Sequence, residues 1–196
     1  MKLTLGDIQD LRAYERERDE FRDRIIELKR ARRVAVGPLL SMVFENAETI
    51  RFQVQEMARA ERILSDDAIQ AELDIYNPLI PDPGQLSATL FIELTSQPQM
   101  REWLPKLVGI ERSMLIRFGP AGEEVRGEPE EAHAAQLTRE EITASVHYVR
   151  FVFTPEQVDA FAAGPADLVA DHPDYQHAAT LGDATRRSLL EDLRPV

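Results

Sequence analysis

Five polar residues in the middle of the chain have the types and spacing that could do chemistry. Gln53, Glu56, Arg59 and Glu61 fall where apolar and charged residues interleave as on a buried helix, and Asn77 follows that stretch. With about 100° per residue, Gln53 and Glu61 lie at the border of an apolar stripe, and Glu56 lies between two apolar faces. A carboxylate in that position must be paired, solvated or protonated. These five residues form a candidate polar pocket.

A surface role explains the same glutamates in a simpler way. Glu56 and Glu61 could pair with Arg59, Arg62 or other arginines, and an exposed helical pair contributes roughly 0.3 to 0.5 kcal/mol. A buried partner for Glu56 would instead indicate a polar pocket inside an apolar layer. Removing the Glu56 charge separates the two interpretations.

Histidine and carboxylate side chains are the strong metal ligands of this chain, because it has no cysteine. The lack of cysteine excludes disulfides, thiolate catalysis and cysteine-held zinc or iron–sulfur clusters. His147 and His172, with a glutamate such as Glu56, could form a site for a divalent metal if the fold brings them together. In the alternative interpretation, His147 is a sheet residue with satisfied hydrogen bonds and His172 is a solvated loop residue.

Composition and charge limit the possible partners. The chain of 196 residues is 43% apolar, enough for one substantial core, so we expect a single α+β domain over residues 1–196. A formal net charge of −12 argues against nucleic acid and anionic membranes as partners. The excess is largest in residues 120–196, with six basic and fifteen acidic side chains, which suits a basic protein partner. No stretch resembles a signal core or a membrane span, so a cytoplasmic protein is expected.

The familiar catalytic motifs are missing from the sequence. There is no GxGxxG or GxxxxGK[ST] loop for phosphates, no HExxH zinc motif and no GxSxG nucleophile elbow. The common enzyme classes that depend on these motifs therefore lose support.

The candidate pocket needs helices to position it, and the first 77 residues are rich in helical patterns. The alternation of Ile50, Phe52 and Val54 also fits a strand over residues 49–55, but the continuation QEMARAERIL favours a helix capped by Asn46. On this helix Ile50, Val54, Met57 and Leu64 would share one stripe. We expect further helices, and the predicted ranges are 14–33, 66–76, 98–107, 155–163 and 181–193, with one more turn at 138–141.

Strand patterns dominate the chain after the proline-rich turn near residue 80. The predicted strands span residues 39–44, 86–94, 110–118, 124–126, 144–154 and 166–170, and an acidic loop is expected at 127–136. The helix-rich part, 1–77, and the strand-rich part, 86–196, are separate along the chain, which argues against regular βαβ winding. The predicted fold is therefore α+β, with an amino-terminal helical layer packed on a mainly antiparallel sheet of about 4–5 strands. The open edge of such a sheet makes a homo-oligomer one expected way of covering it.

Several phrases of the sequence resemble a known bacterial family. These are VFEN, T-x-R-x-Q-x-QEM-x-RAERI, EL-x-x-YN-x-LIP, LSATLFIE, VHYVRF and DHP-x-Y, and they lie within Leu5 to Leu193. Together they resemble the domain of unknown function family 3501. The resemblance implies a gene setting beside rubrerythrin-like and iron–sulfur oxidoreductase-like proteins, hence a peroxide-defence or electron-transfer module. It implies no catalytic residue.

Two functional classes follow. In the first, the chain is a binding or accessory protein that docks a redox partner through its acidic carboxyl-terminal third. In the second, it is a metal-dependent enzyme that uses His147 or His172 with buried carboxylates.

Overall fold

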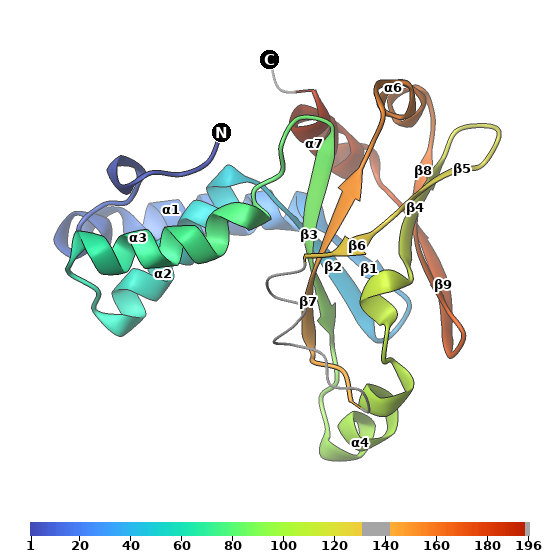
Figure 1. The fold of residues 1–196 in the computed structure, drawn as a ribbon, viewed down its shortest axis with the longest axis horizontal. Coiled ribbons are helices and arrows are strands. Elements are labelled where there is room, and N and C mark those ends of the chain that lie inside the picture. Colours follow the sequence, from blue (N-terminus) through green and yellow to red (C-terminus); the bar gives the residue numbers. More distant parts are fainter. Residues whose placement is uncertain (131–141, 195–196) are drawn as a thin grey trace.

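The protein has a helical region standing beside two β-sheets, as a computed structural model describes for residues 1–130 and 142–194 (Figure 1). The α+β class predicted from the sequence is confirmed. The strands form two antiparallel sheets, of five and four strands, rather than one sheet.

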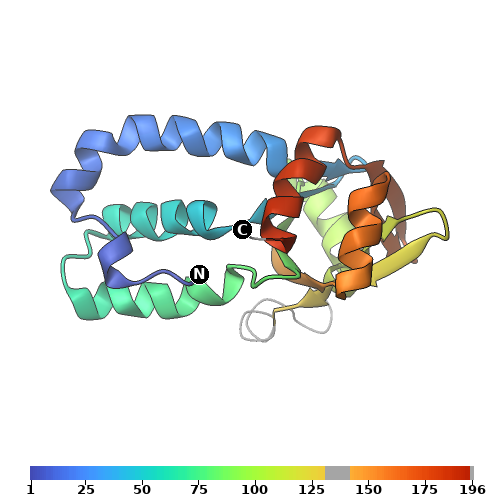
Figure 2. The ribbon, with the colours of Figure 1, turned by 90° about the horizontal axis from the view of Figure 1, so that it is seen from above.

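Three helices form the helical region and lie roughly side by side, extending away from the sheets (Figure 2). They are α1 (Leu11–Arg32), α2 (Ala47–Glu61) and α3 (Asp66–Tyr76), flanked by the short 3₁₀ helices η1 (Leu5–Asp7) and η2 (Asn77–Leu79). Each long helix starts at a side-chain cap, from Asp10, Asn46 and Ser65 in turn. Such caps satisfy amide groups that the first helical turn leaves without partners.

Helix α2 is covered on two faces. On one side, Ile50 and Val54 pack with Leu73 of α3 in an apolar cluster. On the other side, Phe52 packs against a cluster of α1 that contains Phe21 and other apolar residues. The helix interpretation of residues 49–55 is therefore confirmed, and the polar residues between the two faces are held at fixed positions.

The first sheet has the order β1-β2-β3-β7-β6, and the second has the order β5-β4-β8-β9. The strands of the first sheet are β1 (Arg33–Val36), β2 (Leu40–Glu45), β3 (Gln85–Ile92), β7 (Val146–Val152) and β6 (Glu128–Pro129). Those of the second are β5 (Glu123–Arg126), β4 (Met114–Phe118), β8 (Ala166–His172) and β9 (Tyr175–Thr180). Gly37 lets the chain turn between β1 and β2, because its φ of 69° is costly for other residues.

The main core lies between the two sheets. Alternate residues of the first sheet, such as Phe44 and Phe151, join Phe118 of the second sheet in one buried cluster. The other helices of the described residues are α4 (Gln97–Lys106), α6 (Pro155–Ala163) and α7 (Asp183–Leu193), with the 3₁₀ helix η3 (Ile110–Arg112) before β4. Because side chains alternate along a strand, the other residues of the first sheet point away from this core, toward the helical region.

Several predictions about elements need correction. Helix α2 ends at Glu61 because Arg62 adopts a left-handed conformation, so Leu64 leaves the predicted stripe and is 83% exposed. The predicted strand 110–118 begins only at Met114, since its first residues form η3. Two further strands were not predicted, since residues 33–36 pair with β2 as β1 and residues 175–180 pair with β8 as β9. The loop predicted at 127–136 is wrong at Glu128–Pro129, which pair with β7 as β6. The rest of that loop from residue 131 on, and the helical turn predicted at 138–141, lie outside the described residues.

Candidate functional site

Glu56 is paired across the interface of α1 and α2. Its two carboxylate oxygens accept hydrogen bonds from Arg18 Nε and Nη2, both at 2.8 Å, and Oε1 also accepts one from the Tyr14 hydroxyl at 2.6 Å. The Arg18 guanidinium lowers the pKa of Glu56. Burial and the neighbouring carboxylate raise the pKa of Tyr14. The arginine partner comes from another helix, and the arrangement is a closed polar bridge.

The other residues of the predicted polar pocket do not gather around Glu56. Arg59 pairs with Glu15 on the surface, with 2.6 Å between Nε and Oε1. Glu61 is exposed at the end of α2. Asn77 holds the amino-terminal segment, since its side chain accepts from the amide of Leu3 and donates to its carbonyl oxygen. Gln53 alone of the five lines a cavity between the helices and the first sheet.

His147 is buried in the first sheet, on strand β7. Its Nε2 lies 2.8 Å from Thr143 Oγ1 and 2.9 Å from the carbonyl oxygen of Ala144. Burial lowers the pKa of His147, although the nearby Glu111 carboxylate opposes this shift. These hydrogen bonds match the interpretation of His147 as a sheet residue.

His172 lies at the end of β8, in the second sheet, and is buried, so its interpretation as a solvated loop residue is wrong. Its Nε2 is 3.1 Å from the carbonyl oxygen of Val108, and its Nδ1 accepts a hydrogen bond from the amide of Asp174. Glu56, the third member of the predicted metal site, is bound to Arg18 in the helical region. Within residues 1–130 and 142–194, no three His, Asp or Glu side chains are grouped so that they could hold a metal ion.

A cavity of about 280 Å³ lies where the helical region meets the outer face of the first sheet. Its polar lining comes from all three helices and three strands. These residues are Lys29, Glu45, Gln53, Tyr76, Thr89 and Tyr148. Apolar residues such as Ile50 and Phe91 complete the walls. A small organic molecule fits such a mixed cavity.

Because side chains alternate between the two faces of a strand, the outer face of the first sheet forms the floor of the cavity. Phe44 points into the main core, so the next residue, Glu45, points to the opposite face. On the neighbouring strands, Thr89 and Tyr148 are register partners on that same outer face. The Thr89 hydroxyl donates to Glu45 Oε1 at 2.7 Å. The three side chains therefore form a polar row under the helices.

Glu45 is the most unusual residue of this row. It is only 6% exposed, and the Thr89 hydroxyl is its one hydrogen-bonding side-chain partner among the described residues, where no cation lies within ion-pair distance. Burial raises the pKa of Tyr148, and the neighbouring Tyr76 and Glu45 add to the rise. Sequence reasoning missed Glu45; the signal was a glutamate at the end of an apolar strand, on the face opposite Phe44.

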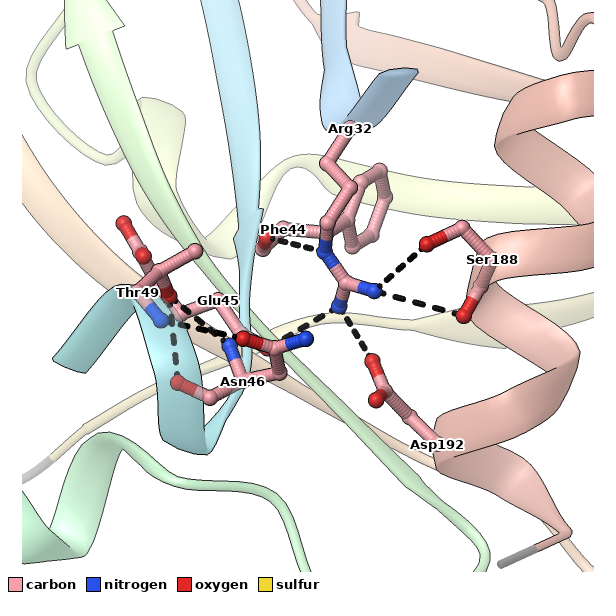
Figure 3. A network of polar contacts seen from close by, with 7 residues as sticks. All are labelled: Arg32, Phe44, Glu45, Asn46, Thr49, Ser188 and Asp192. Atoms are coloured by element: carbon pink, nitrogen blue, oxygen red, sulfur yellow. Dashed lines mark hydrogen bonds and ion pairs between the residues drawn. The ribbon is translucent and has the colours of Figure 1, made fainter. Parts of the chain in front are cut away.

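Beside the cavity, Arg32 forms a closed polar network at the end of α1 (Figure 3). Arg32 is 1% exposed, and its guanidinium reaches the carbonyl oxygens of Phe44 and Glu45 on β2. It also binds Ser188 and the Asp192 carboxylate on α7. The network joins the helical region, the first sheet and the last helix. It therefore fixes the backbone of Glu45.

These features define an α+β protein with a small cavity between its helices and its first sheet. The chain belongs to the family described as protein of unknown function (DUF3501), whose model matches residues 2–193. This confirms the family resemblance seen in the sequence. Among curated proteins, no match was found.

A solved structure is similar over almost the whole chain. It is the crystal structure of a novel protein of unknown function from Burkholderia pseudomallei K96243, with 37% sequence identity and a TM-score of 0.90. The similarity covers 99% of this chain and 100% of that one. Among the described residues, no helix is long and apolar enough to cross a membrane.

Proposed function

We propose that this chain is a binding protein for a small organic cation, held in the cavity with its positive group against Glu45. One observation carries the proposal: a buried carboxylate faces an open cavity and has no cationic partner among the described residues. Burying an unpaired charge is costly, so a protein retains one where something else supplies the opposite charge. An ammonium group in the cavity would supply it.

Two acids that are partly buried between packed elements support this argument by contrast. Asp192 is paired with Arg32, and Glu56 is paired with Arg18. Both acids lie where helices pack, and an arginine of the same chain pairs with each carboxylate. Among the described residues, Glu45 has the Thr89 hydroxyl as its one side-chain partner, and it lies on a cavity wall. A buried acid at a cavity wall whose charge no described residue pairs is a feature expected of a ligand site.

The walls of the cavity are also suited to an organic cation. Tyr76 and Tyr148 line it, and aromatic rings attract cations through their negative faces. The ring of Phe91 already attracts one, since the Arg33 guanidinium carbon lies 5.1 Å from its centroid. The amide of Gln53 adds a further hydrogen-bonding group. The site therefore combines a carboxylate, two phenols and apolar contact.

The test uses choline and ethanolamine as probes, with 3,3-dimethyl-1-butanol as the uncharged isostere of choline. We expect at least one cation to bind with a Kd of about 1 mM or below, and the isostere to bind at least tenfold more weakly. Isothermal titration calorimetry measures both. Glu45→Gln should abolish the preference for the charged probe, because it keeps the shape of the side chain and removes its charge.

A matched control is Glu102→Gln on α4, a helix that contributes no residue to the cavity. It makes the same chemical change and should leave binding as in the parent. Circular dichroism checks that both variants fold. The proposal is wrong if neither cation binds, or if Glu45→Gln binds the charged probe as well as the parent does.

The wider expectation of an accessory protein in a redox module rests on the family resemblance and stays a prediction. Its test is the salt dependence of partner binding, compared with a variant that neutralises acidic residues in 123–131. A binding protein for an organic cation is compatible with such a module but does not require it.

A further inference from the structure

The cavity at Glu45 shares one wall residue with a groove on the outside of α1. Lys29 lines both the cavity and this groove, which has a volume of about 340 Å³. Arg22, Arg30 and Arg33 also line the groove, as do apolar residues that include Ile26. Arg22 and Lys29 are seven residues apart on the helix, so about two turns, or 10 Å, separate them along one face.

This groove is strongly basic in a chain whose net charge is −12. Arg30 pairs with Glu27, and Arg33 pairs with Glu93. Arg22 and Lys29 have no hydrogen bond or ion pair with any described residue. Lys29 is only partly exposed, and it lines the cavity as well as the groove.

A second cation lies against a residue of the cavity wall. Phe91 forms part of the cavity wall, and the Arg33 guanidinium covers its ring. Lys29 and Arg33 therefore both line the groove, next to a cavity whose walls include Lys29, Phe91 and Glu45. The acid, Glu45, therefore lies in the cavity, and the two basic residues, Lys29 and Arg33, lie at the groove.

We propose that the ligand of this cavity is a zwitterion, whose ammonium group meets Glu45 and whose carboxylate or phosphate group meets Lys29 at the start of the groove. This inference rests on the proposed function and adds the second charge of the ligand. Lys29 would repel a simple cation, whereas it attracts the far end of a molecule that carries both charges.

The test compares each cation with its phosphorylated form. Phosphocholine should bind about two- to fivefold more tightly than choline, and phosphoethanolamine should bind more tightly than ethanolamine by a similar factor, as one partly exposed ion pair predicts. The gain should shrink when sodium chloride rises from about 20 to 300 mM, because salt screens charges near the surface. Isothermal titration calorimetry measures each Kd.

Lys29→Gln should remove the gain from the phosphate group and leave choline binding equal or slightly tighter. Lys106→Gln is the matched control, since Lys106 lies on α4 and pairs there with Glu102. It should leave every Kd as in the parent. This pattern distinguishes a specific contact from the general loss of one positive charge.

The outcomes separate this inference from the proposed function. If choline binds through Glu45 but phosphocholine binds no more tightly, the zwitterion is excluded and the cation site stands. If phosphocholine binds through Lys29 and Glu45→Gln has no effect, the site recognises only an anion, and both proposals are wrong. If no probe binds, both are also wrong.

Discussion

Glu45 belongs to two polar regions, the Arg32 network and the cavity, and they differ in how completely a buried charge is paired. Its backbone carbonyl oxygen accepts from Arg32 Nη2 at 3.1 Å, inside the closed network at the end of α1 (Figure 3). Its side chain faces the cavity on the other side. In the network, every guanidinium nitrogen has an acceptor, on Phe44, Glu45, Ser188 or Asp192. In the cavity, the carboxylate has one neutral donor.

The difference separates a structural role from a binding role. A buried charge whose partners all come from the protein joins elements and leaves nothing for a ligand to add. A buried charge that has one partner and faces a cavity can still pair with a charged group of a ligand. The closed network also fixes the position of β2, so the open site is built on a rigid strand. Removing charges from the two regions should therefore have opposite effects on stability.

The largest effect is expected in the closed network. Arg32→Met should lower the free energy of unfolding by about 3 to 5 kcal/mol, because it leaves the Asp192 carboxylate and two strand carbonyl groups without their donor. Urea unfolding followed by circular dichroism measures this change. A loss below about 1 kcal/mol would show that water replaces the guanidinium and that the network is not closed.

The Arg32→Met, Asp192→Leu double variant sharpens this result. Since it removes the uncompensated acid as well, it should recover part of the lost stability. Asp192→Leu alone should leave the Arg32 charge short of its partner and unfold more readily than the double variant does.

An intermediate effect is expected for the bridge between α1 and α2. Glu56→Gln should lower the free energy of unfolding by about 1.5 to 3 kcal/mol, the range for hydrogen bonds to charged groups. The pKa of Glu56 is lowered in the folded protein, chiefly by the Arg18 hydrogen bonds. Its contribution is therefore present above the unfolded pKa of about 4.3 and is lost as the pH falls through the folded value.

The surface pair of Arg59 and Glu15 provides the control for this measurement. Its side chains are 38% and 52% exposed, so Glu15→Gln should change stability by less than about 1 kcal/mol. Urea unfolding from pH 7 to pH 3 compares the two variants with the parent. If Glu56→Gln loses no more than Glu15→Gln at pH 7, the Glu56 bridge behaves as a surface pair.

Much of the fold could be predicted from local patterns. The predicted ranges of α3 and α6 agree with the structure to the residue, because Ser65 and Thr154 are strong caps and the apolar spacing inside is regular. Strand β9 was missed because its residues are mostly polar and exposed, and only pairing with β8 makes it a strand. The division into two sheets depends on such long-range pairings, which no local pattern contains.

The polar sites were harder to predict than the fold, because they depend on which faces of distant helices and strands pack together. The helical wheel correctly marked Glu56 as needing a partner, but the partner, Arg18, lies 38 residues away. The role of Arg32 could not be predicted, since nothing local shows that α7 packs over it. Glu45 has an ordinary sequence context, and its burial comes from helices that cover the outer face of β2.

The smallest effect on stability is expected at Glu45, and its sign is what matters. Glu45→Gln should leave the free energy of unfolding unchanged or raise it by up to about 1 kcal/mol, because the amide still accepts from Thr89 while the cost of burying a charge disappears. Glu102→Gln on exposed α4 gives the baseline, within about 0.5 kcal/mol of the parent. A loss above about 1.5 kcal/mol would mean that the protein already stabilises the Glu45 charge, for example through Lys29, which lines the same cavity. The contrast between the closed network and the open cavity would then be lost.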